Sequence, residues 1–261
     1  MPLVLASASP RRRELLTQCG YAFSVHPAHI PEDPLPDEDP IAYVTRLARQ
    51  KAETVFAEIS SKASAPPQVQ GAPGPDSGTW ASTNLNDTED LSELIVLGAD
   101  TTVVIDDAAA SPTAVPASDK RASAAPQVPS AAPQVPSAAP QVLAKPADAA
   151  DAARMLRLLS GRTHRVITGV AVVTAHRTEV AAEVTGVRFL TLSEEEIAAY
   201  IATGEPMDKA GAYAIQGRAA RWIPRITGDY FNVVGLPLAL VSTMLEALAS
   251  MRPSWELAAR S

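Results

Sequence analysis

The stretch LIVLGADTTVVI, residues 94–105, predicts the central strand of the fold. Its nearly continuous run of apolar residues is typical of a strand that is covered on both faces of a sheet. One carboxylate, Asp100, interrupts the run, and the small residues Gly98 and Ala99 precede it. An isolated buried charge is very costly, so Asp100 must be paired, hydrogen-bonded or bound to a metal. A local cap at the end of the strand is the alternative, but apolar residues continue after Asp100 and favour a functional role.

Helix and strand patterns alternate around this segment. Ser9-Pro10 and Asp39-Pro40 each predict a helix N-cap followed by proline at the first helical position. Helices are also expected at 148–161, 193–204 and 235–251, and strands at 164–175 and 181–192. This mixture predicts an α/β fold with a mixed sheet.

Two segments do not have the composition of folded structure. Residues 64–90 are rich in Pro, Gly, Ser and Asp, and residues 108–140 contain a repeat of AAPQVPS with a seven-residue period. Proline in every repeat excludes a helix, so both segments are expected to be disordered insertions in a single domain that spans 1–261. Strand-like sequence on both sides of 108–140 predicts that this insertion replaces the turn of a β-hairpin. A long insertion is tolerated there because the entropy cost of closing a loop rises only slowly with loop length.

Composition excludes several classes of protein. The 261 residues are 46% hydrophobic and 20% charged, which supports a globular core, and the net charge of −7 argues against a general nucleic-acid binder. The single cysteine, Cys19, excludes an intramolecular disulfide, and we expect a buried structural thiol. No apolar run approaches the length of a membrane span and no secretion signal is evident, so we expect a cytoplasmic protein without a membrane partner.

Basic residues occur in two unusual places. Arg11, Arg12 and Arg13 lie in the first turn of a predicted helix, where the helix dipole already supplies positive charge. Either these positive charges have no function and the helix tolerates their small energetic cost, or an anion binds there. Lys51 shares one face of its predicted helix with apolar residues, namely Val44, Leu47, Ala48 and Val55. It is either a lysine at the rim of the core or an ammonium that lines a cleft.

Further polar residues extend this set. The segment DKAGAYAIQG, residues 208–217, contains Asp208, Lys209 and Gln216, and Glu32 lies in a proline-rich loop. Asp208 and Lys209 could form a solvated pair, and a solvated loop acid is the default for Glu32. Cations near a helix N-terminus suit a polyphosphate, and carboxylates without His or Cys suit Mg²⁺ or Mn²⁺. The sequence has no Walker loop, GxGxxG or GxSxG, which leaves metal-assisted attack of water on a phosphate chain.

Seven segments in order resemble the Maf family, also called septum formation inhibitor proteins, which are nucleoside triphosphate pyrophosphatases. They are LASASPRRRELL, RLARQKA, LGADTTVV, AKP, LSGRTHRVITGV, MDKAGAYAIQG and ITGDYFNVVGLPL. The resemblance implies a fold like that of inosine triphosphate pyrophosphatases, with an elongated mixed β-sheet, flanking helices and a central cleft. It also implies hydrolysis of a nucleoside triphosphate to the monophosphate and pyrophosphate, and it allows a homodimer.

The resemblance also implies residue roles. Asp100 corresponds to the catalytic acid–base residue, Lys145 corresponds to the lysine of a Lys-Pro block, and three residues correspond to positions that influence substrate choice: Arg11, Thr101 and Gln216. The DKAGAYAIQG form resembles the branch that acts on dTTP and UTP, with a house-cleaning role that could extend to modified pyrimidine triphosphates. A glutamine amide can meet the donor and the acceptor on a uracil or thymine edge at once. This sequence departs from the family pattern at Ala214, where the family commonly has glycine.

The resulting hypothesis assigns a role to each candidate residue. The triphosphate is held by Ser7, Arg11, Arg12 and Lys51, and Mg²⁺ or Mn²⁺ is held by Asp100 with Glu32. Asp100, Lys51 and Lys209 are the catalytic candidates, and substrate contacts also include Thr101, Lys145 and Gln216. Asp100 either takes the proton from the attacking water or holds the metal that acidifies it. Lys209 or Lys145 would stabilise charge on the leaving group.

The sequence leaves two other classes of function as alternatives. One is a non-catalytic nucleotide-binding regulator of septum formation and cell division, as the older family name suggests. The other is a nucleic-acid binder that inserts Ser-Pro-Arg-Arg into a minor groove, which the acidic total charge and the buried Asp100 disfavour.

Overall fold

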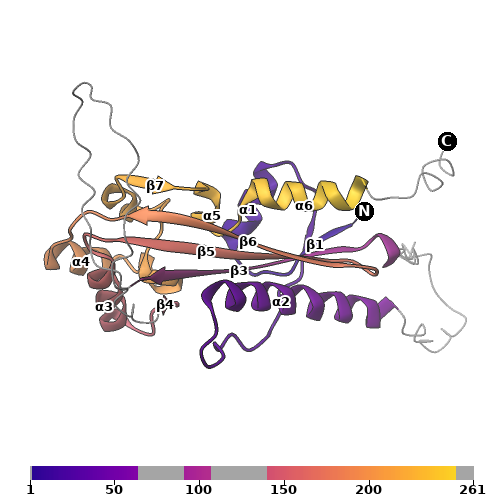
Figure 1. Ribbon diagram of the computed structural model, residues 1–261, viewed down its shortest axis with the longest axis horizontal. Helices are drawn as coiled ribbons and strands as arrows, with labels where there is room; N and C mark the ends of the chain where they lie inside the picture. Colours follow the sequence, from indigo (N-terminus) through magenta and orange to yellow (C-terminus); the bar gives the residue numbers. More distant parts are fainter. Residues whose placement is uncertain (1, 64–90, 107–139, 251–261) are drawn as a thin grey trace, which may run out of the picture. The chain divides into compact units, whose positions relative to one another are not determined.

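The computed structural model of the chain describes residues 2–63, 91–106 and 140–250 (Figure 1). The insertions predicted at 64–90 and 108–140 lie outside the described residues, except for Pro140, so their disorder stays a prediction. The chain divides into two compact units. Unit 1 contains Met1–Thr102, Val166–Thr185 and Ile226–Ser261, and unit 2 contains Val103–Arg165 and Gly186–Arg225. A single domain over 1–261 also stays a prediction.

Within the described residues, seven strands form one mixed sheet. Their order is β2-β1-β3-β5-β6-β7, with β4 paired to β3. The strands are β1 (Leu3–Leu5), β2 (Ser24–Val25), β3 (Ile95–Ile105), β4 (Gln141–Leu143), β5 (Thr163–Val173), β6 (Thr178–Arg188) and β7 (Arg225–Thr227). Strand β1 pairs in parallel with both β2 and β3. The predicted α/β class with a mixed sheet is confirmed, whereas the elongated shape and the central cleft stay predictions.

The helices in the described residues are α1 (Pro10–Gln18), α2 (Pro40–Ala63), α3 (Ala149–Leu159), α4 (Glu194–Ile201), α5 (Tyr230–Val234) and α6 (Leu238–Ser250). Five of these six helices lie at expected segments, and α5 has no counterpart among them. Short 3₁₀ turns are η1 (Leu91–Glu93), η2 (Glu205–Asp208), η3 (Ala210–Ala212) and η4 (Arg218–Trp222). In the described part of the chain, no helix is both long enough and apolar enough to cross a bilayer.

The predicted helix caps are present. The Ser9 side chain accepts a hydrogen bond from the Arg12 amide, and Asp39 Oδ1 accepts from the amides of Ile41 and Ala42. Before α4, Ser193 and Glu196 form a capping box. These caps satisfy amides that would otherwise lack partners, which explains why the helices begin where the sequence predicts.

The hairpin prediction is also confirmed. Strands β3 and β4 are antiparallel, with Val103 opposite Leu143 and Ile105 opposite Gln141. The second insertion therefore connects two paired strands.

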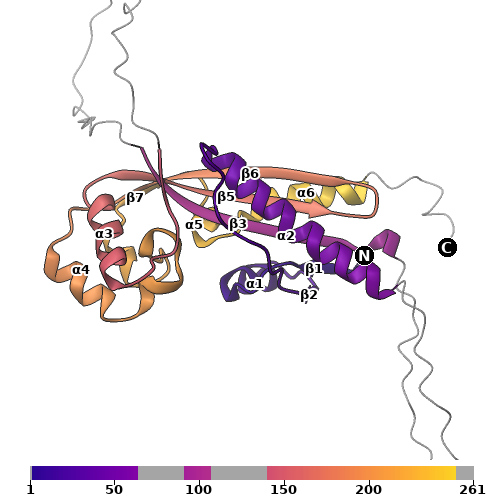
Figure 2. The same cartoon turned by 90° about the horizontal axis from the view of Figure 1, so that it is seen from below.

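Helix α2 packs on one face of the sheet in unit 1, and α6 lies on the opposite face (Figures 1 and 2). Two glycines let α2 approach the strands closely. A Cβ at Gly98 would lie 2.1 Å from the main-chain oxygen of Ala48, and one at Gly169 would lie 2.4 Å from that of Val44. The buried cluster beneath α2 consists of Val4, Ala6, Ala48, Ala52, Val55, Leu94, Val96, Ala171 and Val173. Any larger residue at either glycine would push α2 off the sheet.

The prediction of a buried thiol is wrong. Cys19 is exposed at the C-cap of α1. The next residue, Gly20, has φ +77°, so the helix ends in a turn whose side chains face solvent.

An aromatic cluster in unit 2 surrounds a buried histidine. The His164 ring packs edge-on against Phe189 and Tyr213, at centroid distances of 5.0 and 5.4 Å. Its Nε2 is 2.8 Å from the Tyr213 hydroxyl, and Nδ1 is buried with no hydrogen-bond partner among the described residues. Burial lowers the pKa of His164 to about 3, so this ring is neutral in the folded protein.

This burial predicts a pH dependence of stability. The unfolded histidine has a pKa near its ordinary value of 6.5, so below that pH the unfolded chain binds a proton that the folded chain does not. His164 should therefore lower the free energy of unfolding by up to about 1.4 kcal/mol per pH unit as the pH falls from 6.5 toward 3. Urea unfolding of the wild type and of His164→Gln between pH 7 and pH 4.5 measures this. The variant should show the shallower pH dependence, and parallel curves would contradict the assignment.

Candidate active site

A buried ion cluster lies in unit 1 where α2 covers β3. Lys51 is only 8% exposed, and its Nζ lies 2.7 Å from Asp100 Oδ1 and 2.6 Å from Glu32 Oε1. Asp100 is equally buried, whereas the Glu32 side chain is 49% exposed. The predictions that Lys51 faces inward and that Asp100 is a paired, buried carboxylate are confirmed. The cluster of these three residues is called the Lys51 cluster below.

The glycine contact under α2 explains why these side chains meet. Gly98 is in contact with Ala48 and Ala52, and Lys51 lies between these two alanines in the sequence. Asp100 follows Gly98 by two residues, and side chains two apart on a strand share one face. The backbone approach at Gly98 therefore places the ammonium of α2 beside the carboxylate of β3.

Helix α2 also holds the loop that carries Glu32. The Tyr43 hydroxyl donates to the main-chain oxygen of Glu32 at 2.7 Å. One turn further along, Arg46 donates to both carboxylate oxygens of Glu38, at 2.6 and 2.7 Å. Burial, followed by the negative charges of Asp100 and Glu32, raises the pKa of Tyr43 to about 12. Tyr43 therefore stays protonated and continues to donate to the loop.

A second cationic group, Arg12, lies in the first turn of α1. Its Nε donates to the Gly235 carbonyl at 2.8 Å, one terminal nitrogen donates to Ser7 Oγ at 3.1 Å, and the other donates to Thr101 Oγ1 at 3.0 Å. Each of these partners is a neutral oxygen. The guanidinium is fixed in place while its charge is left available to an anion.

The electrostatic surroundings of Arg12 connect it with the Lys51 cluster. Burial lowers the pKa of Arg12, the positive charge of Arg11 acts in the same direction, and the carboxylates of Asp100 and Glu32 oppose them. Arg12 thus lies within the field of both acidic residues. Arg11 itself is half-buried beside Arg12 on α1.

Thr101 belongs to a chain of hydrogen bonds with a fixed direction. Thr168 Oγ1 donates to the main-chain carbonyl of Asn232 at 3.1 Å and lies 2.9 Å from Thr101 Oγ1. When the single proton of Thr168 goes to that carbonyl, Thr101 donates to Thr168, and the 3.5 Å approach of the Thr101 hydroxyl to the Gly235 carbonyl is the longer alternative. The oxygen of Thr101 then faces Arg12 as an acceptor. The chain therefore fixes both the rotamer of Thr101 and the polarity of its hydroxyl.

Sequence reasoning missed Thr168 and Asn232. Each interrupts an apolar stretch, RVITGVAVV and FNVVGLPL, as Asp100 does in its own strand. Both are buried. The criterion that found Asp100 would have found them as well.

The remaining predicted residues belong to unit 2. Lys145 is exposed just after β4, and Gln216 is exposed between η3 and η4. Lys209 is mostly buried, and its Nζ donates to the carboxylate of Asp208 and to the main-chain carbonyl of Glu205. The structure thus brings together one set of predicted residues within unit 1, namely Ser7, Arg12, Glu32, Lys51, Asp100 and Thr101.

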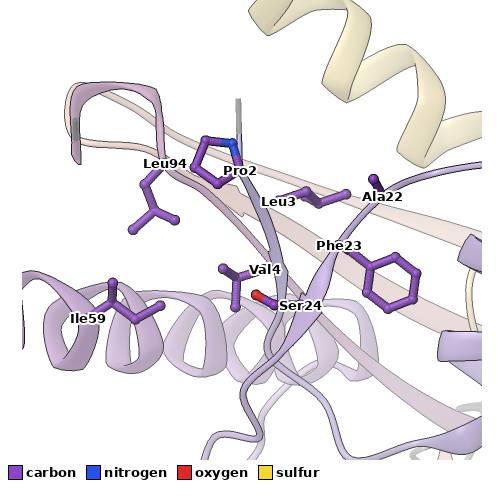
Figure 3. Close-up of a pocket in the computed structure, with 8 residues that line it drawn as sticks. All are labelled: Pro2, Leu3, Val4, Ala22, Phe23, Ser24, Ile59 and Leu94. Atoms are coloured by element: carbon purple, nitrogen blue, oxygen red, sulfur yellow. The ribbon is translucent and has the colours of Figure 1, made fainter. Parts of the chain in front are cut away.

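A hollow elsewhere in unit 1, lined mainly by apolar side chains, is not this site. It has a volume of about 340 Å³ and lies at the N-terminal ends of β1 and β3 (Figure 3). Its lining is Pro2, Leu3, Val4, Ala22, Phe23, Ser24, Ile59 and Leu94. It shares no residue with the Lys51 cluster and has no charged side chain, so it lacks the groups that recognise a polyanion.

Comparison with known proteins identifies the family of the chain that carries the Lys51 cluster and Arg12. A family model described as Maf-like protein matches residues 2–248. The chain belongs to the Maf family. Similar proteins include the dTTP/UTP pyrophosphatases of Koribacter versatilis, 43% identical over 94% of this chain and 93% of the relative, and of Geobacter sulfurreducens, 40% identical over 95% of this chain and 97% of the relative. The dTTP/UTP pyrophosphatase of Symbiobacterium thermophilum is 41% identical over 93% of this chain and 92% of its own.

The hydrogen-bond chain through Thr101, Thr168 and Asn232 predicts that two Thr→Val substitutions change the free energy of unfolding by different amounts. Thr168→Val removes the proton donor to Asn232 and the acceptor for Thr101 at a buried position, so it should lower the free energy of unfolding by about 1–3 kcal/mol. Thr102→Val is the matched control, because the buried Thr102 hydroxyl has no hydrogen-bond partner in the described structure. The control should leave stability unchanged or raise it slightly. Urea unfolding tests both, and equal effects of the two variants would argue against the chain.

Proposed function

We propose that this Maf protein hydrolyses dTTP and UTP to the nucleoside monophosphate and pyrophosphate. The observation that supports this most strongly is that adjacent residues of β3 contact the two cations, Asp100 the Lys51 ammonium and Thr101 the Arg12 guanidinium. Carboxylates and unneutralised cations are needed together by an enzyme that binds a metal-loaded polyphosphate. The relatives named dTTP/UTP pyrophosphatases, which align over nearly the whole chain, support the same conclusion.

The N-terminal end of α1 supplies the phosphate contacts in this proposal. Ser7 precedes the helix, and Arg11 and Arg12 lie in its first turn. A helix N-terminus favours an anion, and the two guanidinium groups add positive charge at the same place. The arginines are tolerated against the helix dipole because the triphosphate neutralises both.

The donor set fits a divalent cation such as Mg²⁺ or Mn²⁺. Asp100 Oδ1 and Glu32 Oε1 both contact Lys51 Nζ, so the two carboxylates lie close together and their other oxygens are hard donors for a cation beside the ammonium. Among residues 2–63, 91–106 and 140–250, no group of three or more His, Cys, Asp or Glu side chains is placed to hold a metal ion. Two carboxylates completed by substrate phosphate oxygens are a common arrangement for Mg²⁺. Bound there, the ion would polarise the phosphate and acidify water.

Asp100 is the proposed catalytic residue. Water attacks the α-phosphorus, the bond from that phosphorus to the bridging oxygen breaks, and pyrophosphate leaves with that oxygen. Asp100 either accepts the proton of the attacking water or serves as a ligand of the cation. Lys51 orients the carboxylates of Asp100 and Glu32 and reduces the repulsion between them.

The residues of unit 2 enter the proposal through the family resemblance. Gln216 is assigned to recognition of the pyrimidine edge, because its amide offers one donor and one acceptor. Lys145 and Lys209 are assigned to charge on the leaving pyrophosphate. A house-cleaning enzyme of the nucleotide pool is expected in the cytoplasm. The names of the relatives favour this enzyme over a non-catalytic regulator of cell division.

The test is pyrophosphate release from a panel of canonical and modified nucleoside triphosphates with Mg²⁺ or Mn²⁺. The wild type should prefer dTTP and UTP. Asp100→Asn should lower turnover by about 10²–10⁴-fold, the usual contribution of a general acid–base group, while leaving Lys51 paired with Glu32 and the fold intact.

Asp39→Asn is the matched control, since asparagine caps a helix as well as aspartate does, and it should keep wild-type turnover. Retained dTTP hydrolysis by Asp100→Asn would refute the catalytic assignment. Absence of pyrophosphate release by the wild type from every nucleotide would refute the proposed function.

A further inference from the structure

Two side chains of unit 2 hold both ends of the short segment that carries Gln216. The Tyr200 hydroxyl, at the end of α4, accepts a hydrogen bond from the Ala214 amide at 3.2 Å and donates to Glu205 Oε1 at 2.9 Å. The carboxylate of Glu205 also accepts from the Arg218 amide, at 3.2 and 3.3 Å. Segment 214–218 is therefore fixed at its first and last residues by one phenol and one carboxylate, called the Tyr200–Glu205 pair below.

The phenol of this pair is itself rigid. Tyr200 is 1% exposed and packs edge-on against Trp222 at a centroid distance of 5.1 Å. Burial raises the pKa of Tyr200 well above its ordinary value, and hydrogen bonding to Glu205 adds to this. Because the Ala214 amide is a donor, the single phenolic proton is directed to Glu205. The direction of every bond in the pair is fixed.

Gly217 allows the carboxylate to approach the segment. A Cβ at Gly217 would lie 1.8 Å from Glu205 Oε1. The Gly217 backbone has negative φ, so the requirement for glycine here is space and not backbone conformation. The Gly217 amide donates to the Ala214 carbonyl at 3.1 Å and closes a turn. Within that turn Ile215 is buried and Gln216 is exposed.

We propose that Tyr200 and Glu205 are positioning residues that set the nucleotide preference through Gln216. This inference rests on the proposed function, in which the Gln216 amide recognises the pyrimidine edge. An amide distinguishes an imide N–H from other base edges only while its donor and acceptor hold one orientation. The Tyr200–Glu205 pair fixes the backbone on both sides of Gln216, so loosening the pair lets the amide turn and meet other bases.

A purely structural role makes a different prediction, and Glu196 provides the comparison. Glu196 lies on the same helix as Tyr200, and its carboxylate accepts from Trp222 Nε1 at 3.2 Å and from the Ser193 amide at 2.9 Å. It makes no hydrogen bond to segment 214–218 among the described contacts. If the Tyr200–Glu205 pair only stabilised the fold, Glu205→Gln and Glu196→Gln would change the same properties.

The experiment measures kcat/KM for dTTP, UTP and dCTP in wild type, Glu205→Gln, Tyr200→Phe and the control Glu196→Gln. Glu205→Gln and Tyr200→Phe should each lower the dTTP-over-dCTP preference about tenfold, the effect of one hydrogen bond. In a Gln216→Ala background, neither should change the preference further, because they act through Gln216. Glu196→Gln should keep the wild-type preference. An unchanged preference in Glu205→Gln and Tyr200→Phe overturns the inference.

Hydrogen–deuterium exchange of the peptide around 213–219 gives a readout that does not depend on activity. Exchange there should be faster in Glu205→Gln than in Glu196→Gln, since the Arg218 amide loses its charged acceptor. Equal exchange in the two variants would overturn the positioning role, even if the wild type hydrolysed no triphosphate. An inactive wild type contradicts the proposed function by itself, so the two failures are distinguishable.

Discussion

The contact of Lys51 with Asp100 and Glu32 is the interaction on which the site depends. Burying the charges of Lys51 and Asp100 is costly, and such a cluster stabilises a fold little compared with apolar residues of the same size. A functional requirement accounts better for its presence. The geometry follows from backbone packing, because Gly98 and Gly169 let α2 lie directly on the sheet. Without that approach, the ammonium and the strand carboxylate would not meet.

The two cationic groups of unit 1 have opposite kinds of partner. Lys51 is neutralised by two carboxylates, whereas Arg12 is held by the neutral oxygens of Ser7, Thr101 and Gly235. The first arrangement gathers hard oxygen donors at one point, and the second presents positive charge to an incoming anion. Adjacent residues of β3 serve both groups, Asp100 for Lys51 and Thr101 for Arg12. Strand β3 therefore serves both the Lys51 cluster and Arg12.

Most of the longer helices and strands could be predicted from the sequence, because hydrophobic periodicity and helix capping depend on neighbouring residues. The sequence predicts helices that begin after Ser9 and Asp39 and a strand around Asp100, and the structure has all three at those positions. The short strand β1, the small helix α5 and the 3₁₀ turns were not predicted, since so few residues carry no periodic signal. The inward position of Lys51 and the burial of Asp100 could be predicted from their apolar neighbours in the sequence, whereas the ion pair between them could not. The partners of Arg12 and the Tyr200–Glu205 pair could not, because they join hydroxyls, carbonyls and amides far apart in sequence.

The most direct test of the central claim is calorimetric titration with a non-hydrolysable α,β-imido analogue of dTTP in the presence of Mg²⁺. The account predicts that the wild type binds the analogue and that Arg12→Gln binds it at least about tenfold more weakly, because a charge-assisted contact to phosphate is lost. Equal affinity of the two proteins for the analogue would contradict the assignment of Arg12 and the neighbouring Lys51 cluster as the triphosphate site.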